Sequence, residues 1–120
     1  MTDKLLHEMR GNTALITINN PAANTWDEDS LAALKSLIET LNNDANCYSL
    51  VITGQGEKFF SAGADLNLFA SGDTDVARLM AEKFHGAFQA LSEFRGVSIA
   101  AINGYAMGGG LECALACDIR

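Results

Sequence analysis

The spacing of apolar residues changes several times along this chain, and that succession limits the fold more than any other feature of the sequence. Residues 4–10 and 13–19 have the composition of strands, and the turn-forming pair Gly11-Asn12 between them predicts a β-hairpin. Residues 48–53 and 97–102 are short apolar runs typical of buried strands. The spacing therefore predicts a hairpin and two further strands.

Two amphipathic helices are predicted between these strands. Residues 25–28 have the form of a capping box, with Thr25 as the N-cap and Glu28 reaching back to it, and residues 42–44 end the first helix. The apolar residues of both helices recur at helical spacing. These two sets are Leu31, Leu34, Ile38 and Leu41, and Val76, Met80, Phe84, Ala87 and Leu91. Strands that alternate with helices predict an α/β fold with a sheet that is parallel over this part.

Length and charge restrict the class of protein. The 120 residues suffice for one soluble domain over residues 1–120, and the formal net charge of -7 disfavours a nucleic acid partner because a phosphate backbone is repelled. The sequence has neither the pattern of a signal peptide nor that of a membrane span. The three cysteines lack metal-ligand spacing, so we expect reduced, packed thiols, no metal site and a cytoplasmic location.

Glu112 is the only charged residue between Arg95 and Asp118, and it follows three consecutive glycines. Apolar surroundings favour the protonated form of a carboxyl group, which suits proton transfer at neutral pH, whereas the dipole of the short helix predicted here favours the charged form. Two interpretations stay equally open from spacing alone. Glu112 is either a catalytic acid–base group or a solvent-exposed side chain at a helix N-terminus.

The run Gly108-Gly109-Gly110 offers a second kind of chemistry. Residues without Cβ let a ligand approach the backbone, and a helix start presents N–H groups that lack an internal partner. Such a site binds an anion, either a phosphate or the oxyanion of a carbonyl in acyl or enolate chemistry. The spacing matches neither nucleotide-binding signature, and close packing of a helix on a strand would also select glycine.

The irregular segment 57–73 contains small residues at positions 61–64, where the backbone could again come close to a ligand. We expect the Asp65 that follows to cap a turn rather than act as a base. His7 and His85 are expected at the surface, and Trp26 is predicted to pack onto the core.

Two of these segments carry a further signal when they are read together. They are Phe59-Phe-Ser-Ala-Gly-Ala-Asp-Leu66 and Ala101-Ile-Asn-Gly-Tyr-Ala-Met-Gly-Gly-Gly-Leu-Glu-Cys-Ala-Leu-Ala-Cys-Asp118, with Ile16-Thr-Ile-Asn-Asn-Pro21 upstream. In this order they resemble the crotonase superfamily, closest to enoyl-CoA hydratase, over essentially the whole chain. The resemblance implies a spiral of ββα units that assembles as a homotrimer or a dimer of trimers. The chain ends before the segment expected to hold the family's second catalytic glutamate, so we expect the N-terminal half of such a domain, incomplete at the C-terminus.

The resemblance also implies roles for individual residues. Ala64 and Gly109 would donate backbone N–H groups to the thioester oxygen of an acyl-CoA as an oxyanion hole, and Glu112 matches the first catalytic glutamate. Ala62, Asp65 and Leu66 would line the CoA and acyl pocket, and the backbone around Ala23 and Asn24 would lie near the pantetheine–adenine end.

The activity implied by the resemblance is hydration of a 2-enoyl-CoA thioester to the 3-hydroxyacyl-CoA. It needs no cofactor, because coenzyme A is part of the substrate. One alternative is an enoyl-CoA isomerase, which needs an oxyanion hole and a base but no added water. Another is a non-catalytic CoA-binding or assembly module in which Glu112 is structural, and a nucleotide-binding α/β domain is a more distant third.

Overall fold

The computed structural model describes residues 2–120, and its elements follow one another as three ββα units. The first unit contains β1 (Leu5–Arg10), β2 (Thr13–Ile18) and α1 (Glu28–Asn42). The second contains β3 (Ser49–Gly54), β4 (Phe59–Ser61), the 3-10 turn η1 (Leu66–Phe69) and α2 (Thr74–Ser92). The third contains β5 (Val97–Ala100), β6 (Tyr105–Ala106) and α3 (Gly109–Ala116). This order confirms the α/β class and the repeated ββα units.

The larger sheet has the strand order β1-β2-β3-β5. β1 and β2 form the predicted antiparallel hairpin, and β2, β3 and β5 run parallel to one another, as expected. β4 and β6 form a small second sheet, which an isolated parallel bridge between Trp26 and Ala64 accompanies. A second such bridge joins Ile119 to Ile99.

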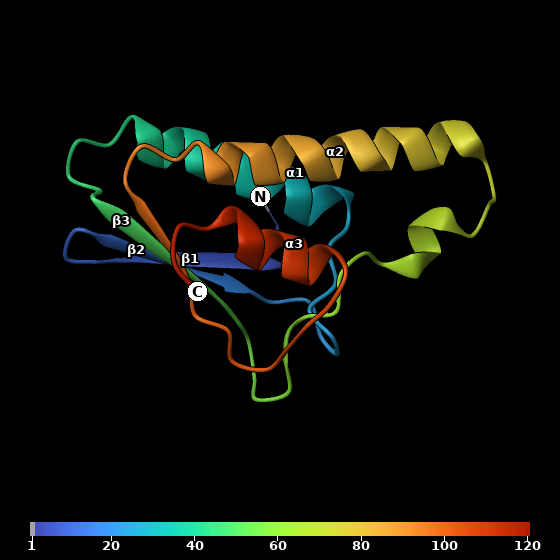
Figure 1. Ribbon diagram of the computed structural model, residues 1–120, viewed down its shortest axis with the longest axis horizontal. Helices are drawn as coiled ribbons and strands as arrows, with labels where there is room; N and C mark the ends of the chain where they lie inside the picture. Colours follow the sequence, from blue (N-terminus) through green and yellow to red (C-terminus); the bar gives the residue numbers. More distant parts are fainter. Residues whose placement is uncertain (1) are drawn as a thin grey trace.

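Two helices cover one face of the larger sheet. α1 and α2 pack side by side over the strands, and α3 lies against α2 on the side of the small sheet (Figure 1). All four predicted apolar residues of α1 are buried, whereas Val76 in the first turn of α2 is 38% exposed, contrary to prediction. In Figure 1 the first turns of α2 extend past the sheet, and the short turn η1 rather than a strand lies beneath them. Within residues 2–120, no helix is long and apolar enough to cross a membrane.

The start of α1 differs from the prediction by two residues. The N-cap is Asp27 rather than Thr25, and Ser30 rather than Glu28 completes the capping box. The Asp27 carboxylate accepts a hydrogen bond from the Ser30 N–H at 2.9 Å, and the Ser30 hydroxyl accepts one from the Asp27 N–H at 3.0 Å. The helix cannot begin earlier because Trp26 is held in the extended bridge to Ala64.

Two asparagines fix the connection between β3 and β4. The side-chain amide of Asn24 donates to the carbonyls of Gln55 and Phe59, each at 3.0 Å. The side chain of Asn103 donates to the Gly54 carbonyl at 2.9 Å and accepts from the Gly54 N–H at 3.0 Å. These bonds hold β4, and hence the loop that follows it, in a defined position.

Candidate functional site

The loop after β4 and the first turn of α3 meet backbone to backbone. Gly63 has φ +103°, and a Cβ on it would lie 2.9 Å from both the Gly109 nitrogen and the Met107 oxygen. A Cβ on Gly110 would lie only 2.0 Å from the Ser61 oxygen. Glycine at these two positions is therefore required by close packing, one of the two interpretations that the sequence left open.

Two backbone N–H groups at this contact have no acceptor within residues 2–120. One belongs to Ala64, because the neighbouring Gly63 oxygen and Asp65 nitrogen are the groups that pair with Trp26. The other belongs to Gly109, the first residue of α3, whose N-cap Gly108 offers no side chain to accept it. Free N–H groups at a helix start and in an adjacent loop can together bind an anionic oxygen.

Ala64 and Gly109 line the same cavity, which has a volume of about 620 Å³ and also includes Glu112. Glu112 lies in the first turn of α3 and is exposed, as one of the two interpretations expected, but it faces this cavity rather than open surface alone. The remaining lining residues come from η1, α2 and the end of α3. They are Phe69, Ala77, Ala81, Phe84, His85, Phe88, Gln89, Ser92, Leu115 and Ala116.

The other predicted site residues surround the loop but do not line this cavity. Asp65 is the N-cap of η1 and accepts from the Asn67 N–H at 3.0 Å, which confirms the predicted capping role. Leu66 is 81% exposed at the start of η1. The Ala62 N–H donates to the Ala23 carbonyl at 2.9 Å, so these two residues tie the loop to the chain before Trp26. Asn24 is buried, and its side chain is engaged by the bonds described above.

Sequence reasoning did not predict the residues of α2 that line this cavity. Phe84 and Phe88 form an edge-to-face pair with ring centroids 5.8 Å apart, and both line the cavity. His85 is exposed, as predicted, yet it lines the cavity as well. Helical spacing identifies which residues of α2 face the rest of the protein. It does not tell which of them line a cavity and which pack in the core.

Two buried cysteines, Cys113 in α3 and Cys117 at its C-cap, are poor candidates for nucleophiles. Burial raises the pKa of the Cys113 thiol well above its usual range. Burial, opposed by a hydrogen bond with Ser98, raises the pKa of Cys117 to about 11. Both side chains are therefore protonated at neutral pH, and both are free, as the prediction of packed thiols expects.

A second cavity, of about 750 Å³, lies between β1 and α1 and contains His7, Asp29 and small or apolar side chains of α1. None of the residues predicted to form the site lines it.

Known proteins with similar sequences include two enoyl-CoA hydratases. A short-chain-enoyl-CoA hydratase of Clostridium acetobutylicum is 36% identical over 119 residues, which are 98% of this chain and 46% of that protein. A crotonyl-CoA hydratase of Syntrophomonas wolfei is 34% identical over 119 residues, again 98% of this chain and 46% of that protein. The chain thus spans about half the length of the curated relatives that it matches.

Solved structures show which fold the chain shares. The structure of Pseudomonas aeruginosa DspI matches with a TM-score of 0.98 and 71% identity over 99% of this chain and 49% of that one. An enoyl-CoA hydratase from Bacillus anthracis matches with a TM-score of 0.95 and 32% identity over 98% of this chain and 46% of that one. These likenesses confirm the predicted crotonase fold.

The family model described as enoyl-CoA hydratase/isomerase matches residues 8–120, nearly the whole chain. This chain therefore belongs to the enoyl-CoA hydratase/isomerase family.

Proposed function

We propose that the protein adds water to 2-enoyl-CoA thioesters, giving 3-hydroxyacyl-CoA. The supporting observation is that two unpaired N–H groups, on Ala64 and Gly109, and the carboxylate of Glu112 border one cavity. Family membership supports an acyl-CoA substrate class. The exposed Leu66 and the neighbouring Ala62 and Asp65 are proposed to contact the CoA and acyl groups, and the backbone at Ala23 and Asn24 the pantetheine–adenine end.

The proposed mechanism separates charge stabilisation from proton transfer. The N–H groups of Ala64 and Gly109 hold the thioester oxygen and stabilise the enolate that forms as water attacks the β-carbon, with about 3–4 kcal/mol from each donor in comparable acyl sites. Glu112 orients the water and takes its proton, so that hydroxide bonds to the β-carbon. The α-carbon receives a proton from a second acid, which the resemblance assigns to a segment after Arg120. No cofactor enters the reaction beyond the coenzyme A of the substrate.

Isomerisation of the double bond is the second candidate, because the matching family model covers both activities. It uses the same two donors and a base that moves a proton between carbons, without water. Product analysis distinguishes the two reactions, since only hydration incorporates oxygen from the solvent.

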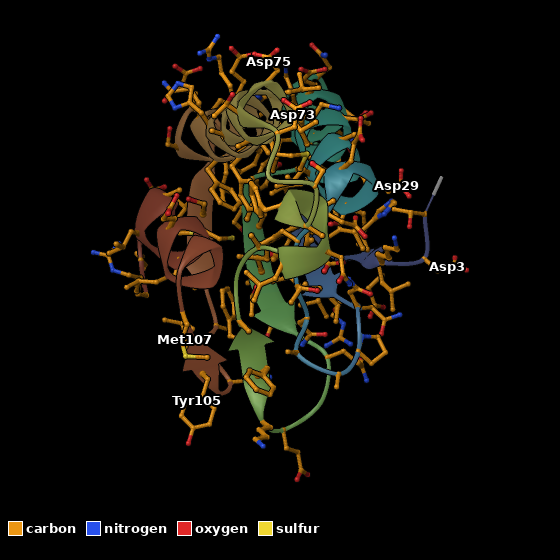
Figure 2. The ribbon with its side chains drawn as sticks, turned by 90° about the vertical axis from the view of Figure 1, so that its right-hand side faces the viewer. Asp3, Asp29, Asp73, Asp75, Tyr105 and Met107 are labelled. Atoms are coloured by element: carbon orange, nitrogen blue, oxygen red, sulfur yellow. The ribbon has the colours of Figure 1, made fainter. Side chains whose placement is uncertain are left out.

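The compartment and the oligomeric state of the protein are part of the same proposal. The three buried, free thiols suit a reducing compartment such as the cytoplasm. Tyr105 and Met107 project outward from one corner of the molecule (Figure 2), and an exposed apolar surface of this kind suits a homo-oligomer such as a trimer or a dimer of trimers.

The near-ultraviolet absorption of acetoacetyl-CoA tests the pair of N–H groups, because binding to an oxyanion hole converts this ligand into its enolate. We expect an enolate band with the wild-type protein and its loss in Gly109→Pro, which removes one donor while proline remains suited to the first position of a helix. The loss of one donor lowers the enolate population by about 10²–10³-fold.

Gly109→Ala is the matched control. Both variants place a Cβ 2.9 Å from Cε1 of Phe84, but only proline removes the N–H. Circular dichroism establishes that each variant is folded. A band of equal strength in Gly109→Pro, or no band from the folded wild-type protein, contradicts the proposed function.

A further inference from the structure

We propose that Trp26 is a positioning residue that sets the separation of the two N–H donors, Ala64 and Gly109. This inference rests on the proposed function, because the separation matters only where both groups hold one oxygen. Trp26 does not line the cavity and is fully buried. Its influence on the site therefore has to act through the residues that it contacts.

The backbone of Trp26 fixes the first donor from both sides. The Trp26 N–H donates to the Gly63 carbonyl at 2.7 Å, and the Trp26 carbonyl accepts from the Asp65 N–H at 2.9 Å. The peptide groups on either side of Ala64 are thus held by one residue, while the Ala64 N–H is left free. A shift of the Trp26 backbone would move the Ala64 N–H with it.

The side chain of Trp26 leads to the second donor through two rings. The indole meets the Phe88 ring edge to face, with centroids 5.7 Å apart and an interplanar angle of 73°. Phe88 meets Phe84 in the same manner at 5.8 Å. Phe84 in turn abuts Gly109 so closely that a Cβ there would lie 2.9 Å from Cε1 of the ring. Three aromatic rings in series therefore connect Trp26 to the start of α3.

Trp26 is therefore connected to both N–H donors, to Ala64 through backbone hydrogen bonds and to Gly109 through the packed rings. Packed rings transmit displacement because interiors have few voids and low compressibility. The backbone hydrogen bonds of Trp26 to Gly63 and Asp65 likewise transmit displacement to Ala64. A donor pair that must bracket one oxygen tolerates little displacement, and a misplacement of about 1 Å can cost about 10²-fold in rate.

The indole nitrogen supplies a way to separate this role from simple stability. Nε1 of Trp26 is the one buried side-chain nitrogen or oxygen within residues 2–120 that has no hydrogen-bond partner. Trp26→Phe removes that unpaired donor and keeps a ring against Phe88, whereas Trp26→Leu removes the ring itself. Both substitutions shorten a core side chain, so a purely structural role predicts similar effects on activity.

Hydration kinetics with crotonyl-CoA test the inference. We expect Trp26→Leu to lower kcat by about 10–100-fold with KM changed less than about threefold, because donors out of place weaken transition-state stabilisation more than binding. Trp26→Phe should stay within about threefold of wild type in both parameters. Ile38→Ala, in the buried face of α1, is the control for core destabilisation and should leave kcat unchanged.

Amide chemical shifts give a readout that does not depend on activity. Trp26→Leu should move the ¹⁵N–¹H signals of both Ala64 and Gly109, whereas Trp26→Phe and Ile38→Ala should move neither. If Trp26→Leu does not fold, Phe88→Leu interrupts the same series of rings and should move the Gly109 signal and lower kcat.

Three results would overturn the inference. They are a wild-type kcat in the folded Trp26→Leu variant, an equal loss of kcat in Ile38→Ala, and a Gly109 signal that stays in place when the rings are removed. Absence of the acetoacetyl-CoA enolate band in the wild-type protein counts instead against the proposed function, and the amide shifts still decide whether Trp26 links the two segments.

Discussion

At the scale of single residues, the exposure of Glu112 in the first turn of α3 agrees with one of the two interpretations of its sequence. It is exposed, so the apolar segment around it does not bury the carboxylate, yet it borders the cavity that also contains Ala64 and Gly109. A ligand seated on those N–H groups would remove water from Glu112 as it bound. Such a ligand would therefore make the surroundings of the Glu112 carboxylate less polar than they are in the free protein.

Glu112→Gln separates catalysis from binding at this position. Glutamine keeps the size and a hydrogen-bonding oxygen but cannot take a proton from water, so hydration of crotonyl-CoA should fall by about 10²–10⁴-fold. The dissociation constant for butyryl-CoA, measured by calorimetry, should change less than about threefold. Glu93→Gln, an exposed carboxylate at the C-cap of α2, is the matched control with wild-type rates expected. A folded Glu112→Gln protein with undiminished hydration would remove Glu112 from the mechanism and favour a binding module.

At the scale of elements, the start of α1 combines a helix cap with an ion pair to Lys4, the residue before β1. Lys4 donates a hydrogen bond to the Asp27 carboxylate at 2.5 Å. Burial raises the pKa of Asp27, but hydrogen bonds from Lys4 and Ser30 outweigh burial and leave the pKa below its ordinary value of 3.8. In return, the hydrogen bond to Asp27 raises the pKa of Lys4 above its ordinary value of 10.5. The pair joins the helix that covers the sheet to the edge strand of that sheet.

The pH dependence of stability follows from the direction of the Asp27 shift. A carboxyl group with a lowered pKa in the folded state contributes stability that is fully present above its unfolded pKa and is lost as pH falls through the folded pKa. Asp27→Asn keeps a good N-cap but loses the charge. Its deficit in unfolding free energy should be constant from about pH 5 to 8 and should shrink below the ordinary value of 3.8.

Urea denaturation at several pH values measures this deficit. Lys4 does not interfere in that window. Its raised pKa contributes stability that is present throughout that pH range and is lost only as pH rises beyond 10.5. Asp27→Ala removes the cap as well and should cost about 1 kcal/mol more than Asp27→Asn. A deficit that grows toward acid pH would show that the Lys4–Asp27 pair does not stabilise the fold.

The elements that sequence reasoning predicted include those with a local period. The hairpin, α1 and the buried part of α2 each contain enough residues to show alternation or helical spacing. β4 and β6 have three and two residues, too few for any period, and they exist because Asn24 and Asn103 hold the neighbouring turn. The displaced N-cap of α1 has the same kind of cause, since a long-range bridge at Trp26 overrides the local capping pattern.

At the scale of the whole molecule, the candidate site forms where two segments of small residues from different ββα units touch. Composition indicated that the backbone at each segment could approach a ligand, but only the contact of Gly63 and Gly110 with the opposite segment brings their N–H groups together. From residues alone the segments stayed separate candidates. The resemblance to a known family paired Ala64 with Gly109, and the cavity contains both. The contribution of α2 required the packed structure, because Phe84 and Phe88 are ordinary core residues by spacing.

Four large apolar side chains are exposed on β6, on α3 and on the segment between them. They are Tyr105, Met107, Leu111 and Leu115, which are 45–60% exposed, and we refer to them as the apolar patch. Tyr105 and Met107 point away from the body of the molecule (Figure 2), and Leu111 and Leu115 are one helical turn apart on α3. Apolar patches of this kind are characteristic of surfaces that another protein covers.

Self-association through this patch is the prediction at the molecular scale. Sedimentation velocity of the purified chain should give a species heavier than the monomer, and the double variant Met107→Ser with Leu111→Ser should shift it toward the monomer, because two apolar side chains at the centre of the contact become polar. Leu79→Ser is the matched control, since Leu79 is 50% exposed on α2 outside the patch and should leave the mass unchanged. A monomeric wild-type chain, or an equal shift in Leu79→Ser, would mean that copies of this chain do not associate specifically through β6 and α3.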